Sequence, residues 1–90
     1  MIAAIGSDGT RPVVWGLGET RAEAVSDAYT TEETWAGDGA AYVEIDERTA
    51  ARVLEGQIDC DALGIAVTAR DGKIVDAEYV GAHLAQAVRS

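Results

Sequence analysis

The sequence predicts one α+β domain of two layers, in which a mostly antiparallel sheet packs on helices in the order ββαβαββα. The chain has 90 residues, of which 48% are hydrophobic, enough for one core but too few for two. Short apolar runs between turn-forming residues indicate strands, and two N-capping signals indicate helices. We therefore expect residues 1–90 to form a single domain.

The chain begins with a predicted hairpin. Residues 2–6 and 12–16 are apolar runs that flank a cluster of turn formers at residues 7–10. Pro12 cannot donate a hydrogen bond to a neighbouring strand, so the second strand is expected at an edge of the sheet. We expect Trp15, on that strand, to belong to the core.

A helix is predicted next, because residues 20–23 match the capping box: the Thr20 hydroxyl would accept from the Glu23 amide, and the Glu23 carboxylate would reach back to the cap. The helix should end near residue 30 or 31. Helical spacing puts Val25, Ala28 and Tyr29 on one face and Glu23 and Asp27 on the opposite face.

The middle of the chain reads as a loop, a strand and a second helix. Residues 32–40 carry two glycines and no periodicity, so they predict a loop, and residues 41–45 suit a strand. Asp46 is expected to cap a helix of about ten residues that stops at Gly56. Three of its residues are expected to face inward: Ala50, Ala51 and Leu54.

A second hairpin is predicted from residues 63–69 and 73–79, after a turn at residues 58–61. A two-residue loop would set Val67 opposite Asp76 and so mix charged and apolar side chains on one face. A three-residue loop with Gly72 in the left-handed region avoids this conflict. We therefore expect the pairs Val67 with Val75, Ile65 with Ala77, and Leu63 with Tyr79. A final helix, over residues 81–89, would present Leu84, Ala87 and Val88.

Two glycine-containing motifs resemble ligand sites only in part. Residues 16–18 follow a strand and precede a helix, as in a dinucleotide-binding turn, but the third glycine is missing and Glu19 would repel phosphate. A tight strand-to-helix turn is favoured there. Residues 59–64 imitate the start of a calcium loop, but Leu63 and Arg70 occupy ligand positions. An Asp-capped turn is favoured, and we expect no metal and no cofactor.

Cys60 and His83 are the candidates for a nucleophile and a base. Two acids flank Cys60 and disfavour its thiolate, and one Cys with one His falls short of a structural zinc tetrad. We therefore expect no enzymatic activity. A single cysteine cannot form an internal disulfide, and the first residues lack the features of a signal peptide, so the expected compartment is the cytoplasm.

Charge is the most informative property of the chain. The net charge is −9, which opposes binding to nucleic acid or to an anionic membrane and favours a basic protein partner. Residues 19–61 hold 12 acids and 3 bases, and residues 22–47 hold no base at all. This segregation suggests a partner-binding face, although a merely solvated surface is the competing interpretation. The candidate residues are Glu23, Asp27, Glu32, Glu33, Trp35, Asp38, Glu44, Asp46 and Glu47.

Trp35 lies in the loop directly after two glutamates. It is either an anchor folded back onto the core or an exposed hot spot ringed by charge.

A short acidic domain with a carboxylate-rich run from Glu23 to Glu47 and a compact α+β pattern resembles the anti-CRISPR proteins of phages and mobile elements. In particular, it resembles the small acidic inhibitors of type I surveillance complexes. The resemblance implies a non-enzymatic inhibitor in the host cytoplasm that binds the basic DNA-binding surface of such a complex and blocks target DNA. The alternative is an acidic protein-interaction module, such as an antitoxin or an assembly subunit, which could use the free edge of the first hairpin.

Overall fold

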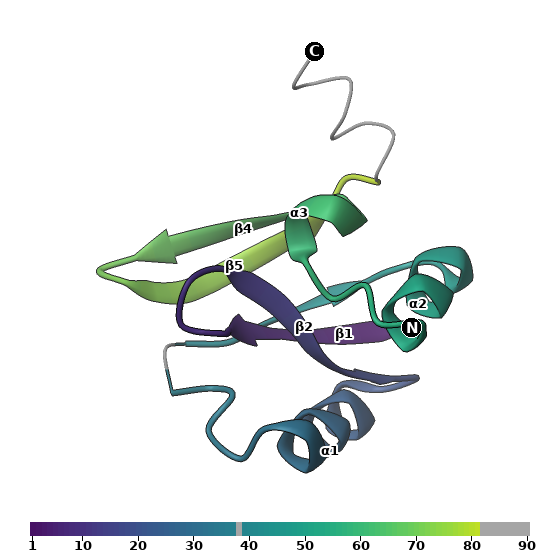
Figure 1. Ribbon diagram of the computed structural model, residues 1–90, viewed down its shortest axis with the longest axis horizontal. Helices are drawn as coiled ribbons and strands as arrows, with labels where there is room; N and C mark the ends of the chain where they lie inside the picture. The colour runs from purple at the N-terminus through teal and green to yellow at the C-terminus, as the bar shows by residue number, and fades with distance from the viewer. Residues whose placement is uncertain (38, 82–90) are drawn as a thin grey trace.

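The computed structural model describes residues 1–37 and 39–81 (Figure 1). Its elements are β1 (Ile2–Ser7), β2 (Pro12–Gly18), α1 (Arg21–Thr31), β3 (Ala41–Glu44), α2 (Glu47–Leu54), α3 (Cys60–Leu63), β4 (Ile65–Arg70) and β5 (Lys73–Tyr79). Asp38 and the predicted last helix, with Leu84, Ala87 and Val88, lie outside the described residues. The α+β class is confirmed, with antiparallel pairing throughout the named strands.

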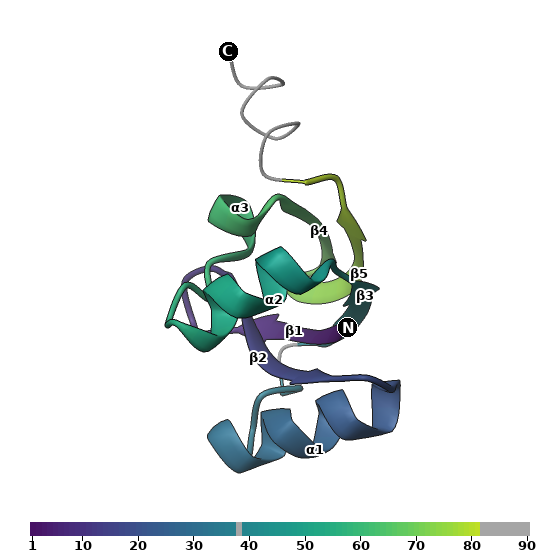
Figure 2. The same cartoon turned by 90° about the vertical axis from the view of Figure 1, so that its right-hand side faces the viewer.

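The strands are divided between two sheets. One sheet has the order β2-β1-β3, and the other is the β4–β5 hairpin. A parallel bridge between Gly39 and Ile74 places β5 beside the entrance to β3. The strands therefore follow one another as β2, β1, β3, β5 and β4 around a common interior, and Figure 2 shows α2 at one end of it.

The three-stranded sheet is buried on both faces because residues alternate along β1. Ala3 and Ile5 join what we call the central core, which includes Leu63, Ile65 and Ile74 from α3 and the second sheet. Ala4 points the other way and packs with Ala24, Ala28 and Trp35 in a second cluster, the α1-side core. In Figure 1, α1 accordingly lies on the opposite side of this sheet from the β4–β5 hairpin.

Helix α1 begins as predicted but buries a different face. The Glu23 amide donates to the Thr20 hydroxyl at 3.2 Å, whereas the Glu23 carboxylate accepts from the amide of Glu19, one residue before the expected one. Ala24 and Ala28 are fully buried, Val25 is half-buried, and Tyr29 is 50% exposed. Of the three residues that helical spacing puts on one face, only Ala28 is therefore fully buried.

Glycines in β2 explain this choice of face. A Cβ on Gly16 would lie 2.4 Å from Ala24 O and from Ala28 N, and one on Gly18 would lie 2.5 Å from Ala24 N. The helix backbone thus rests directly on the strand, and only small residues fit at the contact. This packing, rather than a ligand turn, is what the paired glycines of residues 16–18 provide.

Helix α2 is capped by Asp46, whose side chain accepts from the Thr49 amide at 2.7 Å, as predicted. The helix is eight residues long, and Gly56 follows it with φ +110°. Ala50 is buried, but Ala51 is exposed and Leu54 is 78% exposed, so two of the three expected inward positions are wrong. Thr49 takes an inward place instead, because its hydroxyl bonds to Tyr79.

The second hairpin closes with a two-residue turn and a bulge. Asp71 and Gly72 have φ of +54° and +78°, and Arg70 pairs with Lys73. The register then shifts between Thr68 and Ala69, which leaves Val75 unopposed and 49% exposed. The predicted three-residue loop is wrong, as are its pairs: Val67 faces Ala77 and Ile65 faces Tyr79. The bulge removes the apolar–charged conflict that the two-residue loop would otherwise create.

Candidate acidic partner-binding surface

The described carboxylates of residues 22–47 take no part in the ion pairs that the described residues form. Both ion pairs among the described residues belong to Arg11, which contacts Asp8 at 3.5 Å and Asp59 at 3.2 Å. The seven described acids of residues 22–47 therefore form no ion pair in the described part of the chain. Six are exposed and Glu32 is half-buried: Glu23, Asp27, Glu32, Glu33, Glu44, Asp46 and Glu47.

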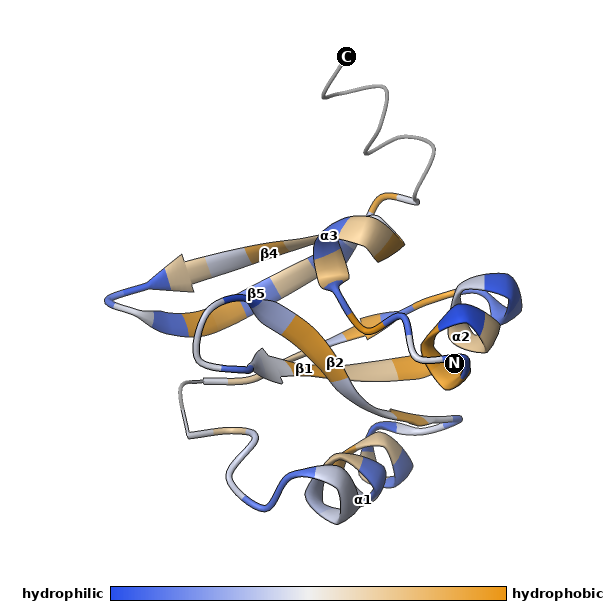
Figure 3. Cartoon of the chain, viewed as in Figure 1, coloured by the Kyte–Doolittle hydropathy of each residue, from blue (hydrophilic) through white to orange (hydrophobic). Residues whose placement is uncertain are grey.

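These acids do not form one continuous face. Helix α1 packs on the sheet through the α1-side core, whereas α2 packs on the opposite face through Ala50 in the central core. Glu44 pairs with Ile2 and therefore points to the α1 side, while Asp46 and Glu47 lie at the start of α2. We call the first group, on and around α1, the α1-side surface: Glu23, Asp27, Glu32, Glu33 and Glu44. Figure 3 shows hydrophilic residues on both helices.

Three of the predicted contact acids also hold the fold together. Glu23 accepts from a backbone amide before α1, and Asp27 accepts from the Leu17 amide of β2 at 2.9 Å. Asp46 caps α2 and accepts from the Tyr79 hydroxyl at 3.1 Å. The hydrogen bond from the Thr49 amide is the main cause that lowers the pKa of Asp46 below its ordinary value.

The remaining acids are freer to meet a partner. Glu32 accepts from the amide and the hydroxyl of Thr34, which orders the turn after α1. Glu33, Glu44 and Glu47 are exposed, and their carboxylates make no hydrogen bond or ion pair with another described residue. Because their carboxylates have no internal role, substitution there tests binding without disturbing the fold.

Trp35 is 2% exposed and is therefore the buried anchor of the two alternatives, not an exposed hot spot. Its ring packs edge-on against Tyr29 and Tyr42, with centroids 5.8 and 6.0 Å away. The Arg21 guanidinium lies 3.9 Å above the Tyr42 ring. Trp35 thus fixes the loop after α1 against the sheet and is no longer a candidate for partner binding. Tyr29, which is half-exposed, is the aromatic candidate that sequence reasoning missed.

Cys60 is buried in the central core at the start of α3, and Asp59 caps that short helix. Burial, with a smaller contribution from the charge of Asp59, raises the pKa of the Cys60 thiol to about 12. A thiol in this state is a poor nucleophile. His83, the other residue of the candidate pair, lies outside the described residues.

The edge of the first hairpin is closed, contrary to the expectation that it could be free. Val13 bridges to Asp59, and the Val14 amide donates to Ile58 O at 2.8 Å. Farther along β2, the Leu17 amide donates a hydrogen bond to the Asp27 carboxylate. No local pattern marks residues 58 and 59 as a neighbour of β2, since the contact spans more than 40 residues of chain.

None of the described helices is long and apolar enough to cross a membrane. No protein-family model matches the chain, and neither a curated protein nor a solved structure matches it.

Proposed function

We propose that this protein is a non-enzymatic inhibitor that binds the basic, DNA-binding surface of a type I CRISPR surveillance complex and blocks target DNA binding. The observation that carries the proposal is the set of seven carboxylates within residues 22–47 that form no ion pair with another described residue. A surface that only served solubility would intersperse the two signs of charge. The inhibitor would act in the cytoplasm of the host cell.

The α1-side surface is the part of the molecule that we assign to the contact. Glu23 and Asp27 are four residues apart on α1, which brings their side chains to neighbouring positions on the helix. Glu32 and Glu33 continue the charge past the end of the helix, and Tyr29 adds an aromatic ring to the same surface. Carboxylates spaced in this way can form ion pairs with lysine and arginine side chains that otherwise bind phosphates.

Binding of this kind has a characteristic electrostatic behaviour. A body with a net charge of −9 is steered toward a basic groove, so association is fast at low salt and slows as salt screens the charges. Lysine and arginine side chains engaged by the inhibitor are withdrawn from DNA, and the bulk of the domain blocks the groove.

The test is inhibition of duplex binding by a purified type I surveillance complex. The full chain should prevent binding of a labelled target duplex. Glu33→Lys should raise the half-inhibitory concentration by about tenfold, equivalent to about 1.4 kcal/mol, because it places a cation against a basic surface. Glu78→Lys is the matched control: it changes the charge equally at an exposed position of β5, outside the acid-rich segment.

Failure of the wild-type chain to inhibit would overturn the proposal, and so would equal effects of the two variants. Capture of a different basic protein, with no effect on DNA binding, would instead favour the acidic protein-interaction module.

A further inference from the structure

Among the described residues, strand β4 has one edge without a paired strand. Within them it pairs with β5 alone, and a two-residue turn joins the two strands. In such a hairpin, Arg70 and alternate residues before it direct their backbone groups toward β5. Gly64 fits this alternation, because its carbonyl accepts from the amides of Val80 and Gly81. The backbone N–H and C=O groups of Ile65, Val67 and Ala69 therefore point away from β5.

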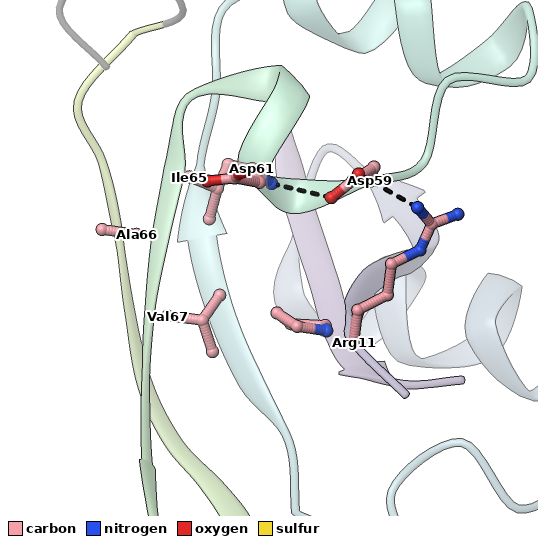
Figure 4. Close-up of a pocket in the computed structure, with 7 residues that line it drawn as sticks. Arg11, Asp59, Asp61, Ile65, Ala66 and Val67 are labelled. Carbon is pink, nitrogen blue, oxygen red and sulfur yellow. Dashed lines mark hydrogen bonds and ion pairs between the residues drawn. The ribbon is translucent and has the colours of Figure 1, made fainter. Parts of the chain in front are cut away.

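The same three residues line a groove. A cleft of about 500 Å³ lies between Ile65 and Val67 on one wall and Pro12 and Asp59 on the other, and a second cleft of about 320 Å³ continues it past Val67 and Ala69. Arg11, Pro12 and Val67 line both clefts. In Figure 4 the Val67 side chain points across the groove toward Arg11. We call this groove the β4 seam.

No described residue on the opposite wall of the groove forms a strand that pairs with β4. Pro12 has no N–H to offer, and the edge of β2 at Val13 and Val14 is already taken by residues 58 and 59. β4 itself carries none of the usual protections of an edge, since it has no proline and no bulged residue of its own, and its one charge is Arg70 at the end. Its outward backbone groups make no hydrogen bond with another described residue.

The charge of the seam indicates what it accepts. Arg11 is shared by Asp8 and Asp59, so the two carboxylates outnumber the one guanidinium. An incoming side chain there is favoured if it is basic, whereas the space beside Ile65 and Val67 is apolar.

We propose that the β4 seam binds an extended segment of a partner protein, which adds as a strand to β4. The segment has small apolar side chains at alternate positions, directed into the groove, and a lysine or arginine that meets the acidic end of the groove at Asp59. Main-chain hydrogen bonds hold the segment in place, and the alternate side chains select it. This site lies apart from the α1-side surface and does not depend on the function proposed above.

The test uses the full chain and a blocked heptapeptide, acetyl-Lys-Val-Thr-Val-Thr-Val-Lys-amide. Amide hydrogen exchange of the free chain should alternate along β4: the amides of residues 66, 68 and 70 exchange slowly, and those of Ile65, Val67 and Ala69 exchange fast. Saturation with the peptide should slow exchange at Ile65, Val67 and Ala69 by at least tenfold. NMR shift changes should be confined to β4 and the residues around Arg11.

Two altered peptides distinguish strand addition to β4 from non-specific association. The same peptide with N-methylated valines cannot donate to β4 and should bind at least tenfold more weakly. The peptide with both lysines replaced by glutamate should also lose at least tenfold, because its charges oppose the carboxylate of Asp59. Unchanged binding of the N-methylated peptide would overturn strand addition.

Slow exchange at Ile65, Val67 and Ala69 in the free chain would also overturn the proposal. Protection that grows with protein concentration would identify a second copy of the chain as the occupant. Protection independent of concentration, and lost when residues 82–90 are removed, would identify the chain's own C-terminal segment.

Discussion

The carboxylate of Asp27, on α1, accepts a hydrogen bond from the backbone amide of Leu17, on β2, at 2.9 Å. This contact closes the part of the β2 edge that residues 58 and 59 do not reach. An acid that the sequence assigns to a partner-binding face therefore also protects a sheet edge from solvent and from other strands.

Asp27→Ala should lower the free energy of unfolding by about 1 kcal/mol, because the Leu17 amide loses its acceptor. Asp27→Asn keeps a side-chain oxygen at the same place and should cost less than half as much. Chemical denaturation of both variants against the wild type measures the difference. Equal losses would show that the charge, and not the hydrogen bond, matters at this position.

Gly16→Ala should lower the free energy of unfolding by about 3 kcal/mol, because the added methyl meets backbone atoms of Ala24 and Ala28 at 2.4 Å. Gly37→Ala is the matched control, since its methyl meets only Thr34 O, at 3.1 Å. Thermal unfolding followed by circular dichroism would compare them. If Gly16→Ala is no worse than the control, α1 does not rest on β2 as described.

Tyr79→Phe should cost about 1–2 kcal/mol of unfolding free energy. The Tyr79 hydroxyl lies 2.7 Å from the hydroxyl of Thr49, which is 5% exposed, and donates to Asp46 at 3.1 Å. Tyr29→Phe removes a hydroxyl that bonds to no other described residue and should be close to neutral. Urea titration would compare the unfolding midpoints of the two variants. Similar midpoints would contradict the hydrogen bonds that join Tyr79 of β5 to Thr49 and Asp46.

The turn between β1 and β2 should weaken in acid. Hydrogen bonds from the amides of Thr10 and Arg11 lower the pKa of Asp8 from 3.8 to about 2. A depressed carboxyl pKa stabilises the folded state above the unfolded value, and that contribution is lost as pH falls from about 4 through about 2. Asp8→Ala should show a smaller fall in urea midpoint over this window than the wild type. Parallel curves for the two proteins would exclude Asp8 as a source of the acid sensitivity.

Local signals were enough to predict the helix starts. Thr20 and Asp46 cap their helices as expected because the capping bond joins residues three apart, and the spacing is visible in the sequence. The inward faces were harder to predict. Tyr29 and Leu54 fit the periodic pattern, yet Gly16 admits only alanine at the α1 contact, and Tyr79 pulls Thr49 inward on α2.

The register of the second hairpin shows where alternation alone fails. The apolar pattern requires Ile65 and Val67 to face apolar residues, and this requirement is met. Two arrangements satisfy it, a longer turn or a bulge, and the alternation of side chains does not distinguish them. The left-handed conformation of both Asp71 and Gly72 selects the short turn, and the surplus residue is accommodated at Val75.

By itself, the sequence determined the α+β class, the caps, the positions of the strands and the confinement of the excess negative charge to residues 19–61. These properties depend on residue types a few positions apart. Only the tertiary structure decided that α1 and α2 lie on opposite faces of one sheet, that Trp35 is buried, and that β4, not β2, has an edge that no other described residue pairs with. Those outcomes depend on contacts between distant residues, such as Val13 with Asp59 and Asp46 with Tyr79, whose packing no local periodicity encodes.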